Sequence, residues 1–132
     1  MQFALLLLTL AGLAALAARL VLALGKRTHD RIEYYTGWGG YRHPVALQNQ
    51  ISKEEAEALA AQGAVWLAAD FSDDGELMRV VKQYRHEVFF EYAYAYHSNG
   101  RLKRATVTRD GRVTVLEYDA RGRRVSEAKI AF

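Results

Sequence analysis

Residues 87–102 read EVFFEYAYAYHSNGRL, and this stretch decides the fold class. From Val88 to Tyr96 every second residue is apolar or aromatic, which is the period of a β-strand with one buried face. Asn99 and Gly100 readily adopt positive φ angles, so they can close a tight hairpin that leads into a second strand near Leu102. The stretch therefore predicts an antiparallel hairpin that carries a row of aromatic side chains on one face. The members of this aromatic row are Val88, Phe90, Tyr92, Tyr94 and Tyr96.

The same turn plan recurs along the chain on both sides of this stretch. An apolar or aromatic residue stands four positions before a glycine, and a charged residue follows that glycine. Residues 85 and 86 make a further tight turn without glycine. Regular turns of this kind are typical of a β-meander. They predict six strands, at about 64–71, 76–84, 87–97, 101–109, 112–118 and 123–131, and the turn glycines are Gly75, Gly100, Gly111 and Gly122.

One short amphipathic helix is predicted before the first of these strands. Ser52 and Glu55 form a capping box, in which each side chain satisfies a free backbone N–H group at a helix start. The helix should run over residues 53–62, and Gly63 should provide its left-handed C-terminal cap. The expected fold class is therefore α+β and mainly β, with one helix on a six-stranded antiparallel meander.

Residues 36–40 contain three glycines and predict a turn or bulge. A phosphate-binding loop is the alternative, but the spacing GxGxxG and a following Lys-Ser/Thr pair are absent. We expect Trp38 and Tyr41 to pack on the sheet, although both stay candidates for partner contacts. The aromatic row has two interpretations as well, a half-buried core face or a binding platform.

The N-terminal residues have the composition of a membrane anchor. Arg19 is the only charged residue in the apolar stretch 3–24, and a helix of this length spans roughly 33 Å, enough for a bilayer core. The positive charges follow the segment, in Lys26, Arg27 and Arg31, so residues 1–25 are predicted to be an uncleaved anchor. Residues 26–31 are then a basic linker, and 32–132 a single small β-rich domain on the cytoplasmic side.

A cleaved signal peptide is the alternative for this segment, because residues 15–17 read ALA and resemble a small-x-small processing site. That alternative would place the domain in the periplasm. Within the segment, Ala11, Gly12, Ala15 and Ala18 form a small-residue face, which permits homo-oligomerisation through the helix or simply faces lipid.

Two resemblances follow from these motifs. The repeated Tyr-x-x-Asn-Gly-x-Leu plan over residues 68–125 resembles the hairpin units of MORN-variant and YD-type β-repeats. Residues 35–37, which read YTG, the single proline Pro44 and residues 96–100, which read YHSNG, together resemble a small uncharacterised bacterial domain family. The second resemblance implies no catalytic residues and no cofactor.

No motif for catalysis or metal binding is found in the sequence. The chain of 132 residues has no cysteine, and its four histidines lack the spacings typical of metal ligands. Its acidic pairs are explained by a turn and by a helix start, and no serine lies in a GxSxG motif. We therefore expect a protein that is not an enzyme and that holds no metal and no cofactor.

The expected function is that of a non-catalytic accessory or assembly subunit, anchored by a single span in a bacterial inner membrane. Its expected partners are the lipid bilayer and a protein or membrane complex, and nucleic acid is the lesser option. Basic residues near the C-terminal turns would place one sheet end on anionic headgroups or on an acidic partner. The alternative is a small-molecule-binding or enzymatic domain with an aromatic pocket between the helix and the sheet. The candidate interaction residues are Trp38, Tyr41, Tyr94, Tyr96, Arg101, Arg104 and Arg112.

Overall fold

The computed structural model of the chain describes residues 31–40 and 42–131. The expected anchor at 1–25, almost all of the expected linker and Tyr41 lie outside these residues. Within the described part, no helix has the length and apolar character needed to cross a bilayer.

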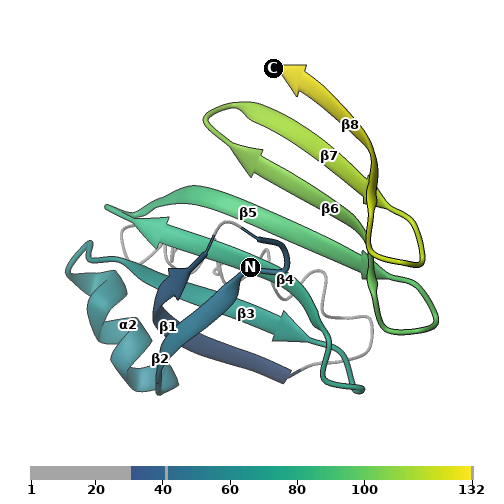
Figure 1. The fold of residues 1–132 in the computed structure, drawn as a ribbon. Helices are drawn as coiled ribbons and strands as arrows, with labels where there is room; N and C mark the ends of the chain where they lie inside the picture. The colour runs from purple at the N-terminus through teal and green to yellow at the C-terminus, as the bar shows by residue number, and fades with distance from the viewer. Residues whose placement is uncertain (1–30, 41, 132) are drawn as a thin grey trace, which may run out of the picture.

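The described residues form one antiparallel sheet of eight strands with one helix (Figure 1). The strand order is β2-β1-β3-β4-β5-β6-β7-β8, so that from β3 onward each strand lies beside the next one in the chain. The helix is α2 (Lys53–Ala61). The strands are β1 (Arg31–Gly39), β2 (Ala46–Ile51), β3 (Trp66–Phe71), β4 (Leu77–Tyr84), β5 (Glu87–Tyr96), β6 (Leu102–Arg109), β7 (Arg112–Tyr118) and β8 (Arg124–Ala131).

The six expected strands are confirmed as β3 to β8, but the expected six-stranded sheet is wrong because β1 and β2 extend it to eight strands. The glycines of residues 36–40 lie mostly inside β1 and not in a turn before the sheet. At Gly39 a Cβ atom would lie 2.6 Å from Nε2 of Gln48 on β2, so glycine leaves room for the end of that side chain beside β1. β2 was missed because its sequence, ALQNQI, has no alternating apolar pattern.

The predicted turn chemistry is confirmed. Arg85 and His86 have φ angles of 55° and 67°, the doubly positive conformation of a two-residue hairpin turn that suits the twist of its strands. Gly100 has a φ of 88°, and its N–H donates to the carbonyl of His97 at 2.9 Å. The same backbone bond closes the β3–β4 and β7–β8 turns.

The capping box of α2 is also confirmed. The backbone N–H of Glu55 donates to Ser52 Oγ at 3.0 Å, and the N–H of Ser52 donates to Glu55 Oε1 at 2.8 Å.

Ala56 and Ala60 are the buried residues of the helix, and they pack on a cluster that includes Trp66. The helix therefore covers β1, β3 and β4 from one side, which we call the helix face; the cluster's further members are Ala68, Val81, Ile32, Tyr34, Ile51 and Leu59.

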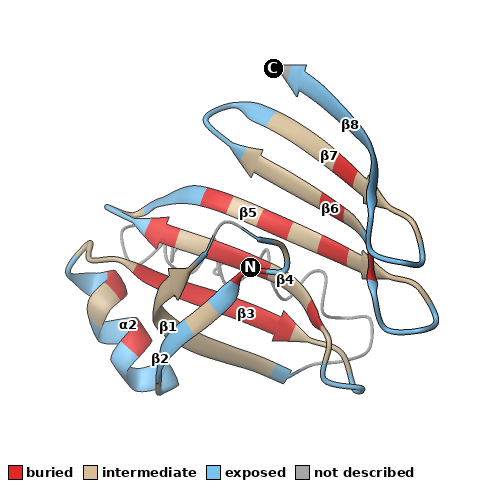
Figure 2. Cartoon of the chain, viewed as in Figure 1, coloured by how far each residue is buried: buried red, intermediate tan, exposed pale blue. Residues whose placement is uncertain are grey.

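The opposite side of the sheet, which we call the aromatic face, holds the larger core. Phe90, Tyr92 and Tyr94 are buried there, and the rings of Phe90 and Tyr92 stack with centroids 4.1 Å apart. The aromatic row is therefore mainly core, although Val88 at its start is 48% exposed. Burial is concentrated in β3, β4 and β5, and it declines toward β8 (Figure 2).

The β1–β2 hairpin twists from one face of the sheet to the other. Tyr34 contacts Trp66 on the helix face, whereas Trp38, four residues later on the same strand, packs edge-on against Phe90 on the aromatic face. β1 pairs with β3 only as far as Tyr35, so its second half is free to curve over the aromatic face. The hairpin thereby provides the cover that the row requires.

Candidate functional site

The covered part of the aromatic row is held by hydrogen bonds to the segment between β1 and β2. The hydroxyl of Tyr94 accepts the backbone N–H of Val45 at 3.2 Å and lies 2.8 Å from Nδ1 of His43. Burial raises the pKa of Tyr94 and lowers the pKa of His43. Tyr94, a candidate contact residue, therefore holds the segment between β1 and β2 against the sheet through its hydroxyl.

Tyr96 and Trp38 are also occupied by contacts within the fold. The hydroxyl of Tyr96 donates to the backbone carbonyl of Leu77 at 2.7 Å, and burial raises its pKa. The ring of Trp38 lies 5.3 Å from that of Phe90, as a residue packed on the sheet should. The position of Tyr41 lies outside the described residues.

The pocket expected between the helix and the tyrosines is not formed. Tyr92 and Tyr94 belong to the cluster on the aromatic face, whereas α2 packs on the cluster of the helix face. The register of β4 and β5 explains this separation. Val80 on β4 lies opposite Tyr92, whereas the next residue of β4, Val81, points to the other face and packs beneath the helix. A pocket that uses both elements would require them on the same face of the sheet.

A cationic–aromatic cluster lies at the end of the sheet where β4 and β5 join. Lys82 Nζ lies 3.9 Å from the ring centroid of Trp38 and 4.5 Å from that of Phe89. The guanidinium of Arg109 lies 5.5 Å from Phe89, and its Nη1 lies 3.4 Å from the hydroxyl of Tyr92. Burial and the nearby Arg109 lower the pKa of Lys82. Among the described residues, neither cation lies within ion-pair distance of a carboxylate.

The cationic–aromatic cluster was not among the residues that sequence reasoning selected. Lys82 lies opposite Phe90, and Phe90 lies opposite Arg109, so the cluster is a cross-strand row over three strands. A register shift between Lys82 and Gln83 contributes to this placement. One sequence signal was available. Lys82 and Arg109 each lie two residues from an apolar residue of the aromatic face on their own strand, and residues at this spacing share a face.

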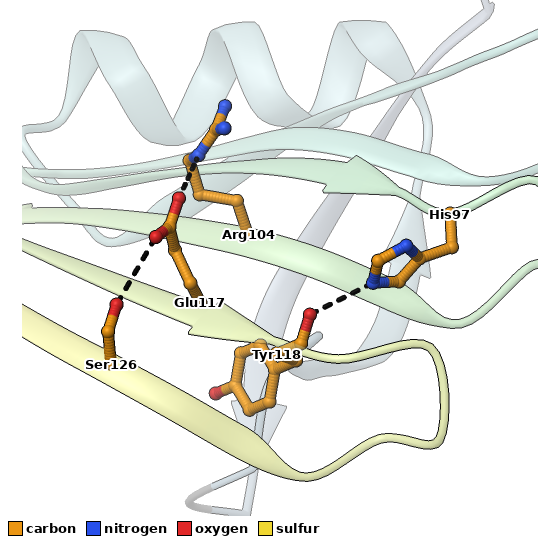
Figure 3. Close-up of polar contacts among 5 residues, drawn as sticks. All are labelled: His97, Arg104, Glu117, Tyr118 and Ser126. Carbon is orange, nitrogen blue, oxygen red and sulfur yellow. Dashed lines mark hydrogen bonds and ion pairs between the residues drawn. The ribbon is translucent and has the colours of Figure 1, made fainter.

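The basic candidates Arg101 and Arg104 make contacts within the C-terminal part of the sheet. Arg101 Nη1 donates to the carbonyl of Arg121 at 3.3 Å and so connects the β5–β6 and β7–β8 turns. Arg104 Nε lies 3.2 Å from a carboxylate oxygen of Glu117, whose other oxygen accepts the hydroxyl of Ser126 on β8 (Figure 3).

The basic residues do not gather at one end of the sheet as expected. Arg112 is exposed at the β6–β7 turn, whereas Arg101 and Arg121 lie at the turns of the opposite end. Two further hydrogen bonds join the β5–β6 and β7–β8 turns. His97 Nε2 lies 2.9 Å from the carbonyl oxygen of Tyr118 (Figure 3), and the side chain of Asn99 donates to the carbonyl of Ala120 at 2.9 Å.

The last strand is the least covered element of the sheet. Within the described part of the chain β8 pairs with β7 alone, and every residue from Arg124 to Ile130 is exposed (Figure 2). Val125 is 61% and Ile130 53% exposed, although both are large apolar residues. Glu127 forms ion pairs within the strand, with Lys129 at 3.3 Å and Arg124 at 3.6 Å. Sequence reasoning predicted this strand but not that both of its faces would be uncovered.

The described residues offer no metal-binding group. Within residues 31–40 and 42–131, no three histidine, aspartate or glutamate side chains are grouped closely enough to hold an ion. His43 and His97 are each engaged by a bond within the fold. The β8 edge and the cationic–aromatic cluster are the two candidate binding surfaces.

Comparison with known proteins gives one match. No curated protein and no solved structure matches the chain. The match is to the model of a domain family whose function is unknown. It confirms the expected relation to an uncharacterised domain family, and it does not confirm the resemblance to MORN-variant and YD-type repeats. The matched region, residues 27–127, contains β1 to β7 and part of β8. The chain thus belongs to the family of unknown function DUF6156.

Proposed function

We propose that the protein is a non-catalytic, membrane-anchored accessory subunit that binds a partner protein through the open edge of β8. Residues 1–25 would hold the domain at the bacterial inner membrane, and the basic residues after them favour a cytoplasmic domain. The partner would add an extended segment to the sheet, which is a common mode of peptide recognition.

One observation carries this proposal: among residues 31–40 and 42–131, β8 is exposed on both faces and has a neighbouring strand on one side only. A strand in that position presents a row of backbone N–H and C=O groups to any extended chain that approaches it. The other edge strand, β2, is less suitable. It is shorter, and Asn49 within it has a φ of 63°, which interrupts its extended backbone.

A photo-crosslinking residue incorporated into the full chain in its own membrane tests this proposal. Replacement of Ser126 on β8 should give covalent adducts with a partner, because Ser126 is exposed and belongs to the strand at the open edge of the sheet. The matched control is Ala58, which is exposed on α2 and far from β8 in the strand order. Equal adducts from both positions, or none from Ser126, would contradict the proposal.

A second candidate function, the binding of an anionic small molecule, is favoured by the cationic–aromatic cluster. Two cations there face the same aromatic rings without a carboxylate from the described residues. A phosphate or carboxylate between them would relieve their repulsion. Trp38 is in contact with Lys82, so titration with inorganic phosphate should change its fluorescence in a saturable way. A response unchanged by Lys82→Met would count against this candidate.

A further inference from the structure

We infer that the segment bound at the β8 edge is β8 of a second copy of this chain, paired antiparallel about a two-fold axis. The inference rests on the proposed function, since it names the partner of the same edge. Closed two-fold dimers are the commonest assemblies of identical chains, and their contact surface must be complementary to itself. The question is therefore whether β8 is complementary to β8.

The faces of β8 restrict the possible registers. Glu127 and Lys129 lie opposite Leu116 and Thr114 of β7, so both are on the aromatic face. If the two-fold axis is perpendicular to the sheet, residues of one face pair only with residues of the same face in the second copy. Each possible register is then centred on one residue, which lies directly opposite the same residue of the second copy. Two such registers pair almost all of the strand, one centred on Glu127 and the other on Ala128.

Charge distinguishes these two registers. Centring on Glu127 would place two carboxylates directly opposite each other, which is destabilising across a strand pair. Centring on Ala128 places Glu127 of each copy opposite Lys129 of the other, which gives two cross-strand pairs of opposite charge. A register centred one residue further along would place Lys129 opposite itself. The sequence of β8 thus favours one register and penalises its neighbours.

The register centred on Ala128 also suits the size and exposure of the strand. It pairs residues 125–131, nearly the full length of β8. Charged residues in an edge strand usually protect it against pairing with other chains. Here Glu127 and Lys129 have opposite signs on one face, so neighbouring registers of β8 with β8 bring like charges together, whereas the register centred on Ala128 does not. Two copies anchored in one membrane would also meet at a raised effective concentration.

A single cysteine placed at the proposed axis tests the inference, because the chain contains no cysteine of its own. Directly opposite residues in an antiparallel pair have Cα atoms about 4.5–5.5 Å apart, which a disulfide can bridge. Ala128→Cys in the full chain, oxidised in its membrane, should therefore give a covalent dimer. Ser126→Cys is the matched control on the same face and strand, since its two copies would lie roughly 13 Å apart along the strands.

Charge reversal provides the second measurement. In the Ala128→Cys background, Lys129→Glu and Glu127→Lys should each lower the yield of dimer about tenfold, because each brings like charges together in both cross-strand pairs. The double variant restores opposite charges and should restore the yield. Circular dichroism of each variant checks that the domain is still folded.

The outcomes separate this inference from the proposed function. No dimer from Ala128→Cys, equal yields from Ala128→Cys and Ser126→Cys, or charge reversals without effect would each overturn pairing with a second copy. If Ala128→Cys gives no dimer while the photo-crosslinker at Ser126 captures another protein, the inference is wrong and the proposed function stands. If neither position gives an adduct, both are wrong.

Discussion

Replacement of Phe90 by alanine tests whether the aromatic row is the core of the domain. Phe90 is 1% exposed, its ring stacks on Tyr92 at 4.1 Å, and Trp38 packs against it at 5.3 Å. Truncation of a buried phenylalanine costs about 3–5 kcal/mol, and the lost ring contacts place Phe90→Ala in the upper part of that range. Since a small domain is stable by about 5–15 kcal/mol, this loss is a large share of the total.

The adjacent residue provides a matched control for this change. Phe89 is 39% exposed, and its ring contacts Lys82. Phe89→Ala should cost about 1–2 kcal/mol from its partial burial and the lost cation–π contact. Unfolding of the full chain by urea in mild detergent, followed by near-UV circular dichroism, measures both losses. Losses that agree within about 1 kcal/mol would refute the assignment of the row to the core.

Three further predictions follow from the same geometry. Tyr94→Phe should lower the free energy of unfolding by about 1–3 kcal/mol in the same urea assay, because the N–H of Val45 loses its buried acceptor; an unchanged midpoint would contradict this. The pKa of His43 is lowered in the folded state, so the unfolded chain binds the proton more readily. Stability should therefore be fully present above the ordinary histidine pKa and decline as pH falls through the folded value, and His43→Gln should remove that part of the dependence in melts from pH 7 to 5. Gly100→Val should lower the free energy of unfolding by at least about 1 kcal/mol, because φ is 88° at this position. No neighbouring atom lies within 4 Å of the added Cβ, so the cost comes from backbone strain alone, and Gly100→Asn should cost less.

Local chemistry explains why most strands could be predicted from the sequence. The turns after β3, β5, β6 and β7 each require a positive φ at a glycine, and a residue type with that requirement is visible in one sequence. The β1–β2 hairpin escaped prediction because its determinants are not local. Gly39 lies against the side chain of Gln48, nine residues away, and the change of face along β1 between Tyr34 and Trp38 depends on the sheet beneath it.

The candidate site was less predictable than the fold. Tyr94 was selected as a contact residue because its strand alternates, but its hydroxyl is engaged by His43, 51 positions earlier in the sequence. The cationic–aromatic cluster depends on a cross-strand register that includes a shift beside Lys82. Registers between strands depend on turn geometry and on packing together, and a single sequence specifies them only in part.

The cover of the sheet comes from the N-terminal side of the domain, and this has a physical consequence for β8. Helix α2 and the β1–β2 hairpin lie over β3, β4 and β5, where the buried clusters are concentrated. Beyond them, the residues of β8 whose burial is described, 124–130, belong to neither cluster. Its attachment relies on backbone hydrogen bonds to β7, on the bond from Ser126 to Glu117 and on the preceding turn, and each such bond contributes only about 1 kcal/mol net.

An element with so little burial belongs to the part of a domain that opens most readily. A second strand at the outer edge of β8 would add a ladder of hydrogen bonds on that edge and shield Val125 and Ile130 from water, which are 61% and 53% exposed. Pairing would thus give β8 the second neighbour that β1 and β3 to β7 already have in the sheet. The exposure that makes β8 the weakest element of the isolated chain is the same property that suits it to bind a partner.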